Sequence, residues 1–142
     1  MEQYLAFAHA HVFLVAALAA SALAIIVNEL HASFTAGRLL SAPEAVRLIN
    51  DQDARVIDVR TAADFKKAHV LGASNIPHDK LKARAGELDR DKTKPVIVYC
   101  ALGGAASRES AQWLREQGYA SAFPLRGGLN AWLAASLPVT TR

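Results

Sequence analysis

The stretch PVIVYCALGGAASRESAQWLREQG, residues 95–118, decides the fold. Its apolar start, residues 95–99, predicts a buried strand, and the pattern from Ser107 to Gln117 predicts a helix that ends at Gly118. A loop of small residues joins the two. This order places the thiol of Cys100 at the N-terminal end of a helix, where unpaired N–H groups favour the reactive thiolate.

Cys100 is the only cysteine of the chain, so an internal disulfide is excluded. Two interpretations remain, a nucleophile or a buried thiol that only packs in the core. The loop favours the nucleophile, because Gly103 and Gly104 permit a backbone whose N–H groups converge on an anion. The residues expected to bind substrate through this backbone are Ala101, Leu102, Gly103, Gly104, Ala105 and Ala106.

Outside this stretch, short apolar runs alternate with helical patterns. Strands are predicted at 55–59, 74–76 and 122–125, and helices at 41–50, 61–67, 79–88 and 129–135. The alternation indicates an α/β fold with a doubly wound parallel sheet flanked by helices. Ligands of such sheets bind beyond the carboxyl ends of the strands, which brings the segments 58–60 and 126–127 and also His78 towards Cys100.

The charge of the chain is uneven. The formal net charge is +3, and every Lys and Arg lies at or after Arg38. Residues 38–142 hold all 16 basic residues and the 13 acidic residues less Glu2 and Glu29, or 11, which gives about +5. No basic stripe is interleaved with aromatic residues, so nucleic acid is not an expected partner.

The N-terminal region is apolar. From Tyr4 to Val27 only His9, His11 and Ser21 interrupt the apolar residues, and a helix of this length reaches about 30 Å. A transmembrane anchor over 1–30, a connector over 31–37 and a domain over 38–142 are therefore expected. A cleaved signal peptide is the alternative, but its usual Lys or Arg is missing before Val12.

The flanking charge gives an orientation for this expected anchor. The basic residues nearest the apolar stretch, Arg38 and Arg47, follow it. The positive-inside tendency then places the domain in the cytoplasm, on a single-pass protein of the inner membrane. A single cysteine is consistent with a reducing compartment.

The domain resembles the rhodaneses, and with its leading helix it is most similar to the single-domain, membrane-anchored bacterial members. The resemblance rests on short matches in order: SAPEA at 41–45, VIDVR at 56–60, DF at 64–65, HVLGASNIP at 69–77, VIVYC at 96–100, LRGGLNAW at 125–132 and LPV at 137–139.

The resemblance implies sulfur transfer. Cys100 would take sulfane sulfur from a donor such as thiosulfate, hold it as a persulfide, and pass it to a thiol or another thiophilic acceptor such as cyanide. No metal or organic cofactor is implied. Asp58 and Arg60 match a motif expected to pair near the end of the sheet in a structural role.

The loop departs from the family pattern Cys-x-x-Gly-x-Arg. Aligned forward from Cys100 the arginine position holds Ala105, and aligned back from the helix it holds Ala106. Arg108 and Arg126 are the candidate replacements for the missing cation.

Two other functions stay open. Dual-specificity phosphatases of rhodanese fold carry Cys-x5-Arg, but Ala106 stands at that arginine position and cannot bind a phosphate in a bidentate way. The other alternative is a catalytically weak binding or regulatory module at the membrane. The sequence predicts neither a protein partner nor an oligomeric state.

Overall fold

The computed structural model describes residues 1, 4, 7, 9–88 and 91–142. The chain divides into two compact units, Met1–Thr35 and Ala36–Arg142. This boundary falls within the expected connector.

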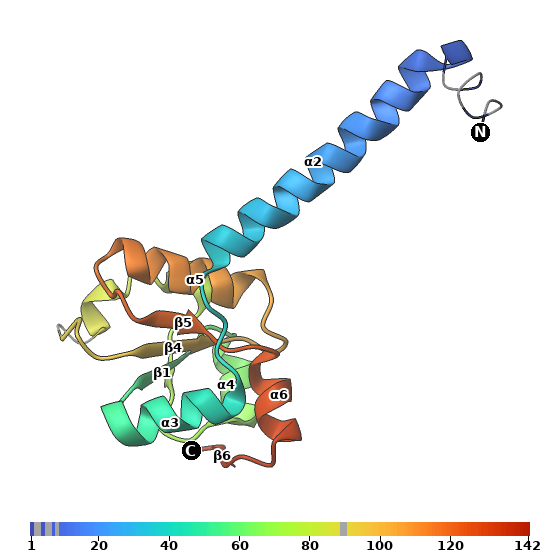
Figure 1. Cartoon of the computed structure of the whole chain (residues 1–142). Coiled ribbons are helices and arrows are strands. Elements are labelled where there is room, and N and C mark those ends of the chain that lie inside the picture. Colours follow the sequence, from blue (N-terminus) through green and yellow to red (C-terminus); the bar gives the residue numbers. More distant parts are fainter. Residues whose placement is uncertain (2–3, 5–6, 8, 89–90) are drawn as a thin grey trace. The chain divides into compact units, whose positions relative to one another are not determined.

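The first unit contains the helix α2, Val12–Ala36 (Figure 1). The prediction of a membrane anchor, and with it of an inner-membrane localisation facing the cytoplasm, is wrong. Among the described residues, no helix is both long and apolar enough to cross a membrane. The physical reason lies in the apolar part of α2, which runs only from Val12 to Val27. Asn28 and Glu29 follow it, so within the helix it is shorter than the ~20 residues that a bilayer requires. Residues 5–6 and 8 of the expected span lie outside the described residues.

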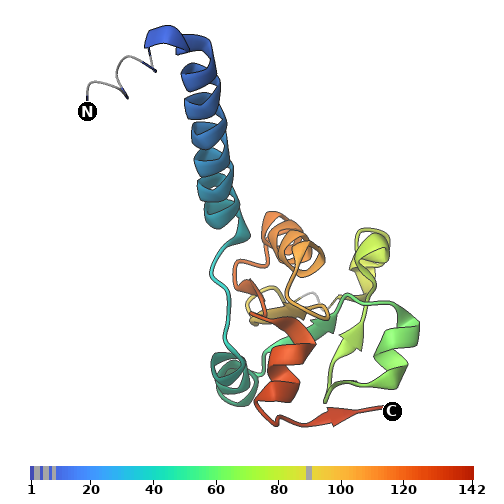
Figure 2. The same ribbon diagram turned by 90° about the vertical axis from the view of Figure 1, so that its right-hand side faces the viewer.

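The second unit is built on a parallel sheet (Figures 1 and 2). Its strands are β1 (Arg55–Asp58), β3 (Ser74–Asn75), β4 (Val96–Tyr99) and β5 (Ala122–Pro124), in the order β3-β1-β4-β5. The register pairs Asp58 with Tyr99, and a parallel bridge from Leu40 to Leu125 continues the sheet beside β5. The predicted α/β fold with a parallel sheet and flanking helices is confirmed.

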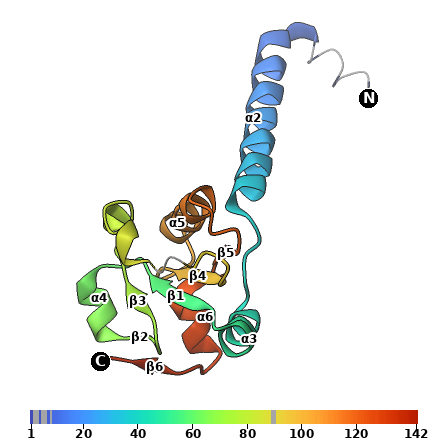
Figure 3. The same cartoon turned by 90° about the vertical axis from the view of Figure 1, so that its left-hand side faces the viewer.

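Helices cover both faces of this sheet (Figure 3). The helices α3 (Ala42–Gln52) and α6 (Gly128–Ala134) pack on one face, in a core that includes Val56, Ile97 and Trp132. The helix α5 (Ala105–Glu116) packs on the other, in a core that includes Ile57 and Val98. Successive residues of a strand point to opposite faces, so β1 and β4 supply both cores and are apolar throughout their centres.

Shorter elements complete the unit. They are α4 (Ala62–Lys67), η1 (His78–Lys80), η2 (Ala85–Glu87), and an antiparallel pair of β2 (His69–Val70) and β6 (Val139–Thr140). The helix predicted over 79–88 is therefore two separate 3-10 turns, with Gly86, a poor helix former, in the second. Most helices begin within about one residue of the predicted position. For example, the carboxylate of Glu44 accepts hydrogen bonds from the backbone N–H and the hydroxyl of Ser41 ahead of α3.

Candidate active site

Cys100 lies directly after β4, at the carboxyl end of the central strand of the sheet. Its thiol is half-buried. The Sγ atom accepts a hydrogen bond from the backbone N–H of Gly104 at 3.2 Å and lies 3.5 Å from the Oγ atom of buried Ser107. The predicted order of strand, loop and helix therefore places the sulfur against the beginning of α5.

Two opposing effects set the pKa of the Cys100 thiol. Burial raises it, while the hydroxyl of Ser107 and the backbone N–H groups of Gly104, Leu102 and Gly103 lower it. The hydrogen bonds outweigh the burial, and the pKa lies below its ordinary value. In the thiol form the Ser107 hydroxyl donates to the carbonyl oxygen of Gly104 at 3.1 Å. A hydroxyl rotates freely, so it can turn to donate to the sulfur once the thiolate forms.

The helix begins earlier than predicted. Its N-cap is Gly104, so Ala105 and Ala106 form the first turn of α5 instead of ending the loop. Alanine is the best helix former, which explains the earlier start. Their N–H groups still lack intrahelical acceptors, as in the first turn of any helix, so they keep the character expected of an anion site.

The loop is held by a glycine pair from a distant part of the sequence. Gly128 has φ +57°, and a Cβ atom there would lie 2.2 Å from the carbonyl oxygen of Cys100. Gly103 has φ +72°, and a Cβ atom there would lie 2.7 Å from the backbone nitrogen of Gly127. Both contacts are too short for any side chain, so the loop and the turn before α6 meet backbone against backbone.

The beginning of α6 also fixes the direction in which the first carbonyl groups of the loop point. The N–H of Leu129 donates to the carbonyl oxygen of Cys100 at 2.9 Å, and the N–H of Asn130 donates to that of Ala101 at 3.1 Å. These carbonyl groups face α6, while the N–H groups of 102–104 lower the pKa of the thiol. The loop thus presents donors to the sulfur and keeps its first two carbonyl groups on the other side.

Asp58 and Arg60 form a pair at the neighbouring strand end. Asp58 is completely buried, and both of its carboxylate oxygens accept hydrogen bonds from the Arg60 guanidinium, at 2.6 to 3.1 Å. Arg60 also donates to the carbonyl oxygen of Ala68 and lies over the ring of Tyr99. Every one of these contacts is internal, which is the arrangement expected of a structural pair.

The two candidate cations are both exposed. Arg126 lies between the buried Leu125 and the glycine pair, and its backbone N–H donates to the carbonyl oxygen of Leu40. Arg108 lies in the first half of α5. Within the described part of the chain, neither guanidinium has a hydrogen bond or an ion pair. Arg126 is the candidate next to the glycines that contact the loop.

The sequence did not single out several residues of the site. Ser107, Leu129 and Asn130 contact Cys100 or its loop, and although the sequence marked Ser107 as a helix start and placed the other two in a motif, no signal indicated these contacts. The consecutive glycines at 127–128 were the one visible sign, as a position where two backbones meet closely. In the described residues, no group of three or more His, Cys, Asp or Glu side chains is placed to hold a metal ion.

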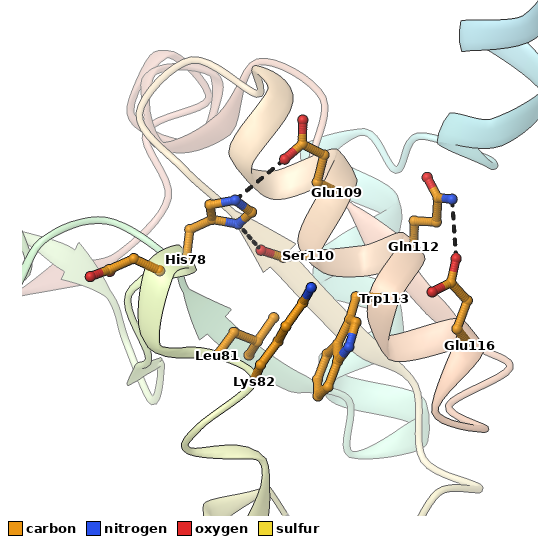
Figure 4. A pocket seen from close by; sticks show the side chains of 9 residues that line it. His78, Leu81, Lys82, Glu109, Ser110, Gln112, Trp113 and Glu116 are labelled. Atoms are coloured by element: carbon orange, nitrogen blue, oxygen red, sulfur yellow. Dashed lines mark hydrogen bonds and ion pairs between the residues drawn. The ribbon is translucent and has the colours of Figure 1, made fainter.

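His78 lies on η1, facing α5. Its backbone N–H donates to the carbonyl oxygen of Val59, just beyond β1. Its ring contacts Ser110 and Glu109 on α5 and lines a cavity between the two elements. The ring of His78 thus packs against α5 (Figure 4), and none of residues 100–106 lines its cavity, so the expected approach of His78 to Cys100 stays a prediction.

Comparison with known proteins agrees with this geometry. The model of the rhodanese-like domain family matches residues 41–135, which is most of the second unit and includes Cys100 and both glycine pairs. The chain belongs to the rhodanese-like domain family. This confirms the resemblance carried by the short motifs.

Curated rhodanese-like relatives cover either the whole chain or its second unit. The uncharacterized protein YibN of Escherichia coli K12 is 34% identical over 140 residues, 98% of this chain and 97% of its own. The thiosulfate sulfurtransferase GlpE of Shewanella oneidensis is 32% identical over 97 residues, 68% of this chain and 93% of its own. The chain is thus a rhodanese-like protein with sulfurtransferases among its homologues.

Solved structures show the same fold. A rhodanese-related protein from Thermoplasma volcanium superimposes with a TM-score of 0.66 at 26% identity, over 74% of this chain and 99% of that one. A thiosulfate sulfurtransferase from Pseudomonas aeruginosa gives a TM-score of 0.67 at 27% identity, over 79% of this chain and 22% of that one.

Proposed function

We propose that the protein is a sulfurtransferase that carries sulfane sulfur as a persulfide on Cys100. The observation that carries this proposal is the environment of the sulfur. The Sγ atom accepts the N–H of Gly104, lies beside the hydroxyl of Ser107, and has a pKa below its ordinary value. The homologues named as thiosulfate sulfurtransferases support the same chemistry.

The reaction has two displacements. In the first, the thiolate of Cys100 attacks the outer sulfur of thiosulfate, the S–S bond of the donor breaks, and sulfite leaves with the bonding electron pair. In the second, the thiolate of an acceptor attacks the outer sulfur of the persulfide. The new S–S bond breaks, and its electron pair returns to Cys100 as a thiolate. No net oxidation occurs, and no cofactor is required.

The protein stabilises negative charge at each stage. The donor, the persulfide and the leaving sulfite are all anions, and the unpaired N–H groups of the loop and of the first turn of α5 are suited to anions. The loop residues 101–106 contribute only backbone donors. Arg126, exposed and without an ion pair among the described residues, is proposed as the cation that binds the anionic donor.

The experiment is intact-mass measurement of the full chain after incubation with thiosulfate. The expected result is a gain of one sulfur atom that is absent in Cys100→Ser and is removed by a thiol acceptor. The Arg126→Ala variant should raise the KM for thiosulfate several-fold, while Arg47→Ala, on α3, leaves it unchanged. If no sulfane donor adds sulfur to Cys100, the proposal is wrong and a binding module is the better interpretation, in keeping with the missing loop arginine.

A further inference from the structure

Residues 37–40, which precede α3, run alongside the end of β5 (Figure 3). The backbone N–H of Leu40 donates to the carbonyl oxygen of Pro124 at 3.0 Å, and the N–H of Arg126 donates to the carbonyl oxygen of Leu40 at 2.7 Å. Leu40 itself is only 2% exposed. Its backbone is therefore fixed to the edge of the sheet on both sides of Leu125. We call residues 37–40 the edge segment.

A second contact holds the other end of the edge segment. Gly37 has φ +67°, and a Cβ atom there would lie 3.0 to 3.1 Å from the Cζ atom and both Nη atoms of Arg115, in the last turn of α5. These nearly equal distances show that the face of the planar guanidinium covers Gly37. The same group donates to the carbonyl oxygen of Ala122, on β5, at 2.9 Å. Arg115 thus joins the edge segment to β5.

The turn after β5 contacts the edge segment and the loop after β4 at the same time. The N–H of Arg126 is bound to Leu40, while the two neighbours of Arg126 contact the loop. A Cβ atom at Gly103 would lie 3.0 Å from the carbonyl oxygen of Leu125 and 2.7 Å from the backbone nitrogen of Gly127. These contacts join backbone to backbone, so no flexible side chain absorbs a movement of the turn.

The shape of this loop decides how well its N–H groups reach the sulfur. The N–H of Gly104 donates to the Sγ atom of Cys100 at 3.2 Å, and the N–H groups of Leu102 and Gly103 also lower the pKa of the thiol. Hydrogen bonds weaken steeply when their angle is lost. A small displacement of Gly103 therefore changes how strongly the thiolate is stabilised.

We infer that the edge segment positions the loop of Cys100, and that Gly37 and Arg115 are positioning residues that hold this segment in place. The edge segment holds Arg126, and the turn around Arg126 holds the loop. Arg115 is eight residues after Ser107, about 12 Å along α5 from the side chain beside the sulfur, so it acts through these contacts. The meaning of the inference for catalysis rests on the proposed role of Cys100, but the geometry requires no persulfide.

The experiment compares Gly37→Ala with Gly72→Ala in the full chain. Both glycines have positive φ, +67° and +80°, so both substitutions introduce similar backbone strain. Only the methyl group at 37 meets a neighbour, because nothing lies within 4 Å of a Cβ atom at Gly72. Gly37→Ala should speed hydrogen exchange of the Arg126 amide at least about tenfold relative to Gly72→Ala. It should also raise the midpoint pH of alkylation of Cys100 by iodoacetamide by about half a unit.

Arg115→Gln removes the same contact without adding backbone strain, and it should give both changes. Lys92→Gln is its matched control. Lys92 also donates to a backbone carbonyl oxygen at the end of α5, that of Gln117 at 2.6 Å, and lies over the ring of Tyr119. This control should keep the wild-type exchange and midpoint. Slow exchange of the β4 amides in every variant shows that the fold is intact.

Two results overturn the inference. Exchange of the Arg126 amide at the control rate in both variants shows that Arg115 does not hold the edge segment. Faster exchange with an unchanged alkylation midpoint shows that the segment does not position the loop. Alkylation needs no sulfur transfer, so the two proposals fail separately. A wild type that gains no sulfur contradicts the proposed function alone, and matching midpoints in a wild type that gains sulfur contradict this inference alone.

Discussion

Ser107, in the first turn of α5, favours the thiolate of Cys100, the proposed nucleophile. Its hydroxyl lowers the pKa of Cys100 against the burial that raises it. Replacing Ser107 by Ala should therefore move the pKa upward, so that less thiolate is present at neutral pH. The pH profile of alkylation by iodoacetamide measures this directly.

The expected result is a profile whose midpoint lies at higher pH in Ser107→Ala than in the wild type, with the same plateau rate at high pH. Ser121→Ala, at the start of the segment before β5, is the control and should keep the wild-type midpoint. A midpoint in Ser107→Ala at or below that of the wild type would show that the hydroxyl does not stabilise the thiolate.

Gly128 tests the close contact behind the loop. A Cβ atom at this position would lie 2.2 Å from the carbonyl oxygen of Cys100, and its φ of +57° disfavours a side chain. Gly128→Ala should therefore lower the free energy of unfolding by about 3 kcal/mol and abolish persulfide formation, because the loop must move.

Gly86→Ala is the matched control for this substitution. A Cβ atom at Gly86 meets nothing within 4 Å. Its effect on urea unfolding should stay within about 1 kcal/mol. Equal effects of the two substitutions would contradict the view that Gly128 is required by its contact with the loop.

Some residues of the site could be predicted from the sequence, and others could not. The order of strand, glycine loop and helix was enough to place Cys100 and the backbone donors, because all of them lie within a few residues of one another. The contacts of Ser107 and of the beginning of α6 with Cys100 and its loop were missed, since a serine in a helix has many ordinary roles and a predicted helix does not show what its first N–H groups bind. The contact of Gly128 with the loop depends on tertiary packing across a long separation in sequence.

At the scale of the elements, the pair of Asp58 and Arg60 joins several strand ends. It links β1 to Ala68, ahead of β2, and to the ring of Tyr99 on β4. The side-chain amide of Asn75, on β3, donates to the carbonyl oxygens of Asp58 and Arg60. Four strands therefore meet at one buried ion pair.

Removing the charge of Asp58 should be costly. Asp58→Asn leaves the Arg60 guanidinium, only 12% exposed, without its counter-charge, and should lower the free energy of unfolding by about 3 kcal/mol. Asp53→Asn is the control. The Asp53 carboxylate is highly exposed and pairs with Lys94, so its loss should cost less than about 1 kcal/mol. Chemical denaturation compares them, and similar losses would contradict the role of the buried pair.

The elements themselves were predicted best where the local signal was strong. The buried strand before Cys100 and the capped starts of α3 and α4 are at their predicted places. The segment 79–88 is not the single helix predicted there, because it forms two 3-10 turns, of which η1 packs against α5. The short pair of β2 and β6 joins segments about seventy residues apart, which no local pattern reveals.

At the scale of the whole second unit, β4 is the best protected element. All four of its residues are buried, and it lies between β1 and β5 with a packed core on each face. Its amide hydrogens should exchange slowest, at least about a hundredfold more slowly than those of η1 and η2. Hydrogen exchange followed by NMR tests this, and equal protection in η2 would contradict it.

This arrangement bears on the position of the proposed nucleophile. Cys100 follows the best protected strand of the sheet, so the backbone that carries its sulfur is fixed by the centre of the fold.

The single thiol of the chain has one more consequence. With Cys100 as the only cysteine, the protein contains no resolving thiol. A sulfenic acid formed by peroxide at this position cannot be captured as an internal disulfide, and its rescue requires a reductant from outside. A sulfenic acid at Cys100, like the proposed persulfide, is therefore reversed only by an encounter with another molecule, which makes recovery of this thiol depend on the reductants around the protein.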